Sequence, residues 1–333
     1  MESAYAAMRS GLIVVEDLDA DPHAVQRLGD HDLECVHAHP DRPATVFVGT
    51  YDAGLYRSTD AGDTWDRIGA TTIDEDAVMS VTANPRDPTE VWVGTEPSRV
   101  YHSTDGGDSW THRDGLVDLD SEPQWSFPPR PHTHHVRWIE VDPHDPAHLY
   151  VGIEAGALVQ THDRGRTWED RVVSANLDNH TLATHVDAPD RAYSAAGDGY
   201  AETTDGGQTW SSHQEGLVHD YVWGLAVDPG DPDTVLVSAA TGARSAHTYD
   251  TADAHCYRRT SEGAWRPIDD TGLPTGTGAL RSVLTAGAAA GEFYALNNHG
   301  LYRSTDAGDT WTAIPIAWPD RFETETSRGL AVV

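Results

Sequence analysis

The chain has 333 residues, with 54 acidic and 22 basic residues, a formal net charge of −32 and two cysteines, Cys35 and Cys256. Every basic residue is Arg, because the sequence contains no Lys. A nucleic-acid partner requires a basic surface, so this charge excludes one. Two cysteines without a CxxC motif exclude a disulfide framework and a Cys-based zinc site. Because a carboxylate coat keeps a protein soluble at high salt, the composition predicts a halophilic, acidic protein.

The N-terminal residues 3–29 contain three short segments of strand composition, near residues 4–8, 11–16 and 24–28. The apolar run 11–15 is too short for a signal peptide or a membrane span. We therefore expect a cytoplasmic location, no contact with a membrane, and a monomer.

Six repeating units follow along the chain. Each begins with an apolar strand that runs into a Pro/Asp turn and continues as a second strand, such as residues 36–40 before residues 45–49. Short apolar runs between turn residues are typical of buried strands. The units span approximately residues 31–70, 77–116, 133–174, 178–218, 219–272 and 276–316.

A second repeat joins the last two strands of most units. The pattern Ser/Thr-x-Asp-x-Gly-x-Ser/Thr-Trp occurs five times, at residues 58–65, 103–110, 161–168, 203–210 and 304–311. The Asp can accept turn N–H groups, the Gly permits a positive φ, and the Trp can bury its ring between sheets. We therefore predict structural roles for the Asp and Trp of each copy: Asp60, Trp65, Asp105, Trp110, Asp163, Trp168, Asp205, Trp210, Asp306 and Trp311.

Repeats of about 40–50 residues, each making a four-stranded sheet, are typical of β-propellers. The six units leave residues 327–333, which read as one strand, and the three strands of residues 3–29. One strand plus three makes a seventh sheet that joins both chain ends and removes a free sheet edge. The prediction is an all-β chain, with residues 1–333 forming a single seven-bladed propeller of four-stranded antiparallel blades. Six blades with loose ends is the alternative.

The five copies closely resemble the Asp-box, or BNR repeat, of β-propeller proteins. Similar boxes occur in sialidases, xyloglucan-type glycoside hydrolases, sortilin-like receptors and photosystem II assembly factors. The chain is most similar to WD40/YVTN/BNR-like repeat proteins labelled glycosyl hydrolase. The resemblance implies a propeller with its boxes on the blade periphery, and it leaves the activity open. The early Arg-Ile-Pro motif of sialidases is missing, so classical sialidase activity is not expected.

One pole of the propeller should collect polar side chains. Alignment of the inner strands on their Pro/Asp turns places four residues at one equivalent position: Asp32, His135, His180 and Tyr221. Two residues further along the strands come Glu34, Arg137, Trp223 and Arg281. A period of two places both sets on one side of their strands, toward the channel mouth. Loops at the same pole add further polar residues: Asp52, Glu96, Trp125, Arg130, His132, His134, Glu154, Asp198 and His299.

This mixture predicts a site for a small polar or anionic molecule, a glycan or a protein partner, because Arg grips carboxylate or phosphate and Trp stacks on rings. The predicted ligand-binding residues are Trp125, Arg130, His132, His134, His135, Arg137, Glu154, His180, Tyr221, Trp223, Arg281 and His299.

The alternative function is a glycosidase-like hydrolase or a lyase. It would use a carboxylate pair among Asp32, Glu34, Glu154 and Asp198. No cofactor is expected. The imidazoles together with Glu154 or Asp198 could hold a divalent metal, but no compact ligand spacing requires one.

Overall fold

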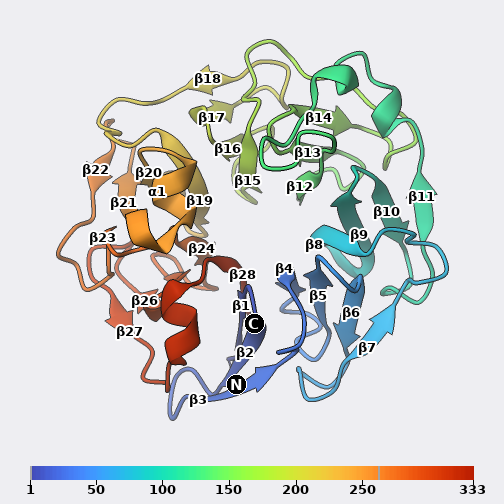
Figure 1. Ribbon diagram of the computed structural model, residues 1–333. Helices are drawn as coiled ribbons and strands as arrows, with labels where there is room; N and C mark the ends of the chain where they lie inside the picture. Colours follow the sequence, from blue (N-terminus) through green and yellow to red (C-terminus); the bar gives the residue numbers. More distant parts are fainter. Residues whose placement is uncertain (1, 262) are drawn as a thin grey trace.

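The computed structural model describes residues 2–261 and 263–333, and these residues form seven antiparallel sheets. The sheets stand like blades around a central channel (Figure 1). The chain is therefore an all-β, seven-bladed propeller, and the fold class predicted from the sequence is confirmed. The six-bladed alternative is wrong, because both chain ends take part in one further blade.

That closing blade joins the two ends of the chain. β28 (Ser327–Val332) pairs with β1 (Ala4–Met8), which is followed outward by β2 (Gly11–Glu16) and β3 (His23–Arg27). Beyond the strands, the N–H of Ser3 donates to the carbonyl of Val333 at 2.7 Å, and the N–H of Val333 donates back at 2.9 Å. The C-terminal strand thus completes the ring.

The other six blades follow chain order, each running from an inner strand at the channel to an outer strand. The first two contain β4 (Leu33–Ala38), β5 (Val46–Thr50), β6 (Leu55–Ser58) and β7 (Asp66–Ile68), then β8 (Ala77–Asn84), β9 (Asp87–Glu96), β10 (Val100–Ser103) and β11 (Thr111–Arg113). The next two contain β12 (Val136–Val141), β13 (Leu149–Ile153) and β14 (Ala157–Thr161), then β15 (Asn179–Thr184), β16 (Ala192–Ala196), β17 (Gly199–Thr203) and β18 (Ser211–Ser212). The last two contain β19 (Tyr221–Asp228), β20 (Asp231–Ala240), β21 (Asp253–Arg259) and β22 (Arg266–Pro267), then β24 (Val283–Ala286), β25 (Phe293–Asn297), β26 (Gly300–Ser304) and β27 (Thr312–Ala313).

Two blades depart from four strands. In the β12–β14 blade the fourth strand is reduced to one bridge between Gln160 and Glu169. In the β19–β22 blade, β23 (Gly276–Thr277) adds a fifth strand beside β21. The few short helices lie in loops: η1 (Leu116–Asp118), η2 (Glu122–Gln124), α1 (Ala243–His247), η3 (Tyr249–Thr251) and η4 (Asp320–Thr324). Within residues 2–261 and 263–333, no helix has the length and apolar character needed to span a membrane.

Large apolar side chains fill the space between neighbouring blades. Between the β4–β7 and β8–β11 blades, Trp110 packs with Phe47, Ile73 and Val78 in one buried cluster. A similar cluster surrounds Trp265 between the β15–β18 and β19–β22 blades. An aromatic ring buries about 150–250 Å², so these contacts fix each blade against the next.

Glycines near the ends of the second strands let the blades approach each other closely. A Cβ atom at Gly94 would lie 2.6 Å from Val136 Cβ in the next blade, and one at Gly49 would lie 2.6 Å from the carbonyl oxygen of Val78. Atoms do not pack this closely, so both positions require glycine. The close approach gathers the first residues of the inner strands around one end of the channel, which we call the mouth.

The Asp-boxes form hydrogen-bonded turns between the third and fourth strands. In the first box, Asp60 accepts the hydroxyl of Thr64 at 2.6 Å, the N–H of Thr64 at 2.9 Å and the hydroxyl of Ser58 at 2.8 Å. These bonds, led by that of the Thr64 hydroxyl, lower the pKa of Asp60 to about 2. Trp65 Nε1 donates to the carbonyl of Gly62 at 3.0 Å. In the other four boxes the equivalent hydroxyl donates to the box Asp at 2.6–2.7 Å, so all five carboxylates have local partners.

Candidate functional site

A β-bulge near the start of the inner strand recurs in six of the seven blades. A bulge inserts one residue without a partner and re-aims its side chain. The inserted residues are Glu34, Met79, Arg137, His180, Trp223 and Arg328. In the remaining blade Arg281 stands two residues before β24. The bulges thus supply the mouth with charged and aromatic side chains from five blades, and Arg281 adds one from a sixth.

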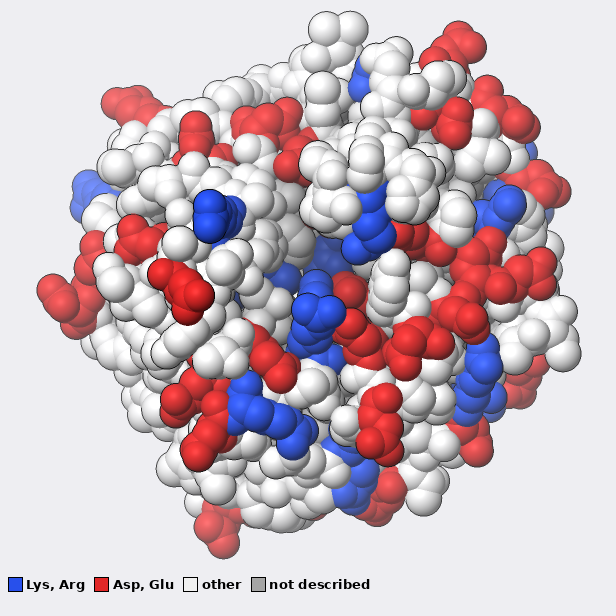
Figure 2. Space-filling view, viewed as in Figure 1, with Lys and Arg blue, Asp and Glu red and all other residues white. Residues whose placement is uncertain are grey.

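The mouth leads into a channel with a cavity of about 370 Å³. Glu34, Arg137, Trp223 and Arg328 are among its lining residues. In the space-filling view, basic side chains lie in the hollow at the centre of this face, whereas acidic residues cover much of the rim (Figure 2). Arginine side chains therefore gather at the mouth of an otherwise acidic molecule.

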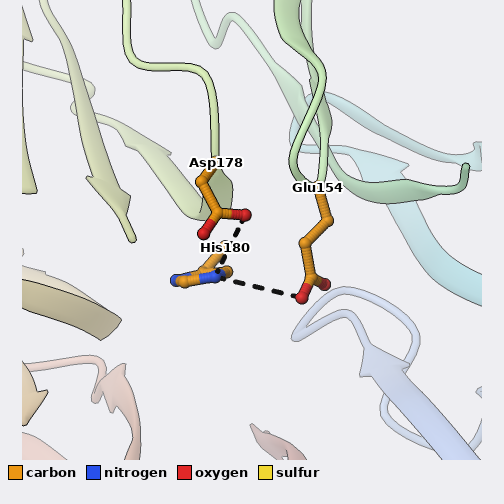
Figure 3. Close-up of side chains that lie close together, drawn as sticks. All are labelled: Glu154, Asp178 and His180. Carbon is orange, nitrogen blue, oxygen red and sulfur yellow. Dashed lines mark ion pairs between the residues drawn. The ribbon is translucent and has the colours of Figure 1, made fainter. Parts of the chain in front are cut away.

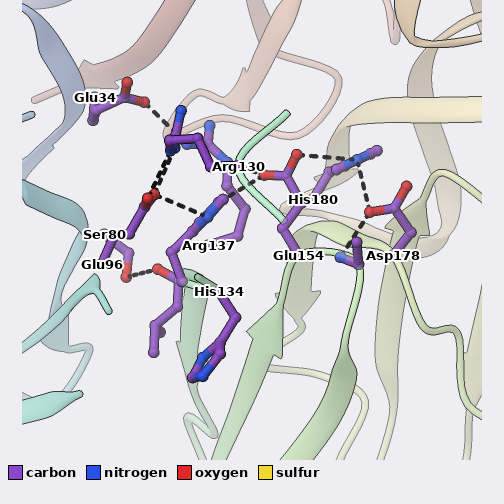
Figure 4. Close-up of polar contacts among 12 residues, drawn as sticks. Glu34, Ser80, Glu96, Arg130, His134, Arg137, Glu154, Asp178 and His180 are labelled. Carbon is purple, nitrogen blue, oxygen red and sulfur yellow. Dashed lines mark hydrogen bonds and ion pairs between the residues drawn. The ribbon is translucent and has the colours of Figure 1, made fainter. Parts of the chain in front are cut away.

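A chain of ion pairs crosses one side of the mouth (Figure 4). Arg130 donates two hydrogen bonds to Glu96, from Nε to Oε1 at 2.6 Å and from Nη2 to Oε2 at 2.5 Å. His135 lies between two acids, with Nδ1 3.4 Å from Glu96 Oε2 and Nε2 2.9 Å from Glu154 Oε2. The side chain of His135 is 1% exposed, so these groups form a buried network rather than surface pairs.

Opposite charges set the ionisation of this network. Burial opposes the charged form of Glu96, but contacts with His135 and Arg130 outweigh burial and lower its pKa to about 2. Burial also opposes the charged form of Glu154, and contacts with His135, His180 and Arg137 hold its pKa well below the usual range. Burial alone would lower the pKa of His135, yet its hydrogen bond to Glu154 and its contact with Glu96 raise it. His135 is therefore stabilised as a cation between two anions.

Two further arginines share one carboxylate. Glu34 Oε2 lies 3.3 Å from Arg328 and 3.6 Å from Arg137. The guanidinium of Arg137 also lies 4.0 Å from Glu154 and stands over the ring of Trp223, with Cζ 5.0 Å from the ring centroid. The Nε atoms of Arg137 and Arg328 have no hydrogen-bond partner among the described residues.

Arg281 has no acidic partner among the described residues. Its Cζ lies 3.8 Å from the ring centroid of Trp223, and its Nε donates to His247 Nδ1 at 3.0 Å. Both terminal nitrogens lack a hydrogen-bond partner, although the side chain is only 1% exposed. Burial, followed by the nearby charges of Arg137 and Arg328, lowers the pKa of Arg281 well below its usual value.

His180, Asp178 and Glu154 form a third group at the mouth (Figure 3). His180 Nε2 lies 3.7 Å from Asp178 Oδ1 and 4.0 Å from Glu154 Oε1. Its ring stacks on Trp223 with centroids 4.1 Å apart, and Tyr221 places its hydroxyl 3.4 Å from Nε2. One imidazole and two carboxylates that converge in this way could hold a divalent metal.

The comparisons place the chain in a family. A family model described as "Photosynthesis system II assembly factor YCF48" matches residues 32–215, more than half of the chain. The chain belongs to the YCF48 family. No curated protein matches the sequence.

Solved structures of YCF48 have the same fold over most of their length. YCF48 from Cyanidioschyzon merolae is 15% identical with a TM-score of 0.59, and the match covers 86% of this chain and 85% of that one. A structure of YCF48 bound to D1 peptide is 17% identical with a TM-score of 0.58, covering 91% and 92%. At this identity the likeness shows the fold alone.

Enzymes of a second group also contain a similar propeller. The GH74 enzyme from Niastella koreensis is 14% identical with a TM-score of 0.69, and the match covers 97% of this chain and 52% of that chain. An ancestral GH74 enzyme is 14% identical with a TM-score of 0.64, covering 99% and 40%. The chain therefore spans about half or less of these enzymes.

Eight of the twelve predicted ligand-binding residues lie in the mouth of this YCF48-family propeller. They are Arg130, His135, Arg137, Glu154, His180, Tyr221, Trp223 and Arg281.

The other four predicted residues lie on loops, outside the groups described above. Trp125 is buried in an apolar cluster and donates to Ser121 Oγ at 2.9 Å. His134 packs edge-on against Trp125 and contacts Ser98 at 2.8 Å, so both stabilise the loop before β12. His132 is exposed, and His299 is exposed with Nε2 3.1 Å from the carbonyl of Gly278. The strand pattern could not place these residues because they stand on loops outside the bulges.

Two of the predicted carboxylates also serve elsewhere. Asp32 pairs with Arg9 at 3.0 Å. Asp198 accepts the backbone N–H groups of Leu177 at 3.0 Å and of Asp178 at 3.3 Å. Both carboxylates therefore stabilise loop geometry beside the mouth, and the carboxylates that approach each other are Glu154 and Asp178.

The sequence alignment missed Asp178 because it misplaced one turn. The bulges make His180 equivalent to Arg137 and Trp223, which makes Asp178 the equivalent of His135 and Tyr221. A local signal could have shown this. In the turn after β15, His185 accepts the N–H two residues later at 3.1 Å, as Asp142 and Asp228 do in their turns at 2.7 and 2.8 Å.

Arg328 and His247 were missed for different reasons. Arg328 lies on β28, and the inner strands were aligned on the Pro/Asp turns that follow them. No such turn follows β28, so the alignment did not include it. His247 lies at the end of α1, outside the strand repeat.

Proposed function

We propose that this protein binds an anionic group, a carboxylate or a phosphate, at the mouth of its channel. The observation that carries the proposal is Arg281, whose two terminal nitrogens lack hydrogen-bond partners among the described residues although the side chain is 1% exposed. A buried charge without a partner costs several kcal/mol. A bound carboxylate or phosphate would accept both N–H groups in the bidentate geometry that Arg favours.

The local charge balance supports an anion. The charges of Arg137 and Arg328 act on Arg281, and Glu34 is the acid that Arg137 and Arg328 share. Glu154 contacts Arg137 only at 4.0 Å and is already hydrogen-bonded to His135. The three guanidiniums therefore exceed the acids that neutralise them, and a ligand anion would supply the missing charge.

The aromatic side chains suggest how the rest of a ligand would lie. Trp223 is contacted by Arg281 and Arg137 and is stacked on His180. A planar or apolar part of the ligand would extend past this group into the channel, which is lined by apolar residues such as Leu182 and Leu225. A family relative, YCF48, has been solved bound to D1 peptide, so the anion could belong to a small molecule or to an acidic peptide.

The test compares Arg281→Gln with the parent protein. Metal-free protein in molar KCl is titrated calorimetrically with inorganic phosphate and with glutarate. We expect Arg281→Gln to weaken binding of at least one of them by tenfold or more, since it removes the free N–H groups. Arg86→Gln is the control and should bind normally, because Arg86 is exposed in the turn between β8 and β9, at the end of β8 that lies away from the mouth. Equal affinity in the parent and Arg281→Gln would contradict the proposal.

A glycosidase-like activity is the second candidate, and one observation favours it. Glu154 and Asp178 each offer a carboxylate oxygen within 4.8 Å of the other, close to the roughly 5–5.5 Å of retaining glycosidases. Their ionisation is also opposed. The pKa of Asp178 is raised to about 6 by burial and by Glu154, whereas that of Glu154 lies well below its usual range. Such a split suits one acid and one nucleophile.

Assay of aryl glycosides and xyloglucan with the parent protein and with Asp178→Asn tests this second candidate. The candidate predicts turnover that Asp178→Asn abolishes. No turnover by the parent protein, or the same turnover in both, would contradict it.

A further inference from the structure

We propose that Glu154, Asp178 and His180 bind a divalent transition-metal ion, Zn²⁺ or Mn²⁺, at the mouth of the channel. The three side chains come from two adjacent blades and point toward one another (Figure 3). One ligand atom from each lies within 4.8 Å of the other two. The proposal does not depend on the anion site, because metal binding can be measured with no other ligand present.

The tautomer of His180 is fixed by a backbone contact. Its Nδ1 lies 2.7 Å from the carbonyl oxygen of Val222. A carbonyl only accepts, so Nδ1 carries the proton and Nε2 presents its lone pair to Asp178 and Glu154. This arrangement, in which the far nitrogen of a histidine donates to a carbonyl, is common among metal ligands.

The distances leave room for a metal ion. Zinc bonds of about 2.0–2.2 Å in a tetrahedral site place ligand atoms about 3.3–3.5 Å apart. His180 Nε2 lies 3.7 Å from Asp178 Oδ1 and 4.0 Å from Glu154 Oε1. Both distances exceed this spacing by less than 1 Å, and the two carboxylate oxygens lie within 4.8 Å of each other, so the carboxylates must close in on the imidazole to share one ion.

Second contacts hold both carboxylates in place. Glu154 uses Oε2 to accept from His135 at 2.9 Å, and Arg137 approaches this same oxygen. The oxygen that faces His180 is the other one, Oε1. Asp178 accepts the N–H of Ala155 at 2.8 Å. Partners of this kind orient metal-binding carboxylates in known sites.

Glycine at position 197 makes space for Asp178. A Cβ atom there would lie 1.9 Å from Asp178 Oδ2. No arginine pairs with Asp178 among the described residues, and its carboxyl is 31% exposed. Among the described residues no Arg or Lys stands between Asp178 and Glu154, and a metal ion there would neutralise Asp178.

Three protein ligands leave a position open on the metal, as in catalytic zinc sites. That position would be filled by water or by an anion. Arg281 lies near enough to His180 for its charge to act on the imidazole. A metal at this point would also occupy the carboxylates that a metal-free glycosidase needs.

The test is calorimetric titration of metal-free protein with ZnCl₂ and with MnCl₂, each alone. We expect binding of one ion per chain for at least one metal, and at least a tenfold loss of affinity in Asp178→Asn and in His180→Gln. His180 is buried, so His180→Gln could fail to fold. Asp178→Asn has nearly the same shape as the partly exposed parent side chain, so its metal affinity then tests the proposal. Gly197→Ala should also weaken binding by displacing Asp178.

A matched control excludes unspecific binding to an acidic surface. His255 also lies between two carboxylates, 3.7 Å from Asp253 and 3.7 Å from Asp269. His255→Gln should leave the one-ion binding unchanged. Absence of binding by the parent protein, undiminished binding by Asp178→Asn, or an equal loss in His255→Gln would overturn the proposal. None of these outcomes bears on Arg281, whose anion binding is measured without metal.

Discussion

At the scale of single residues, the mouth depends on charges that hold each other in buried positions. His135 is the clearest case, because it contacts Glu96 and Glu154 and is 1% exposed. Removing one partner from such a group leaves the others buried without compensation, which is more costly than losing a surface ion pair. We therefore interpret His135 as a residue that positions Glu154, whereas Arg281 has free N–H groups to offer a ligand.

This difference predicts a pH dependence. The pKa of His135 is raised in the folded protein, so its contribution to stability is fully present below its unfolded pKa of about 6.5 and is lost as the pH rises through the folded value. Denaturant titrations of the parent protein and of His135→Gln should give a larger difference in unfolding free energy at pH 6 than at pH 9. A difference that does not vary with pH would contradict the assignment. The other histidines are present in both proteins, so their contribution to the pH dependence cancels in this difference.

At the scale of elements, the inner-strand bulges of six blades and the Asp-boxes of five blades have different roles. The bulge at the start of the inner strand presents a side chain to the mouth, and the Asp-box turn at the outer strands places a Trp between blades. The bulged residues include two arginines, a histidine and a tryptophan, whereas the blade of β8 presents Met79. The boxes bond mainly within themselves. Ligand chemistry can therefore vary at the bulges while the boxes keep the blades packed.

Truncation of a box tryptophan tests the structural half of this division. Trp110 is 8% exposed and packs against residues of two blades. We expect Trp110→Ala to lower the unfolding free energy by about 3–5 kcal/mol, measured by denaturant titration, with anion binding unchanged. Trp65→Ala, at a box Trp that is only partly buried, should cost less. Loss of anion binding in a folded Trp110→Ala protein would argue against the division.

At the scale of the whole molecule, ring closure and site formation are linked. β28 pairs with β1 to complete the seventh blade, and the same strand carries Arg328 to the mouth. The C-terminal segment thus contributes both to the fold and to the charge of the candidate site.

Removal of residues 327–333 tests this link. Without β28, β1 becomes an unpaired inner edge, and exposed edges promote association. We expect the truncated protein to melt at a markedly lower temperature and to form larger species in size-exclusion chromatography. Arg328→Gln, which keeps the strand, should melt near the parent temperature. A truncated protein with the elution volume and the melting temperature of the parent would show that closure is not required.

The sequence allowed prediction of the fold because each repeat carries its own local signals. Pro/Asp turns and Asp-boxes fix strands and turns within one blade, and the leftover segments at the two ends supply the closing blade. The site was harder to predict, because it forms between blades. Eight predicted residues lie there, but Asp178, Arg328 and His247 depend on bulge register, ring closure and a loop helix. Trp125 and His134 had suitable chemistry, yet their loop folds them onto each other.

The most direct test of the central claim is a crystal structure of the protein soaked with selenate, an anion whose selenium scatters anomalously. We expect an anomalous peak at the mouth beside Trp223, within hydrogen-bonding distance of the terminal nitrogens of Arg281, that disappears in Arg281→Gln. Selenate bound only at other positions, with Arg281 instead paired to a carboxylate of the protein, would contradict it.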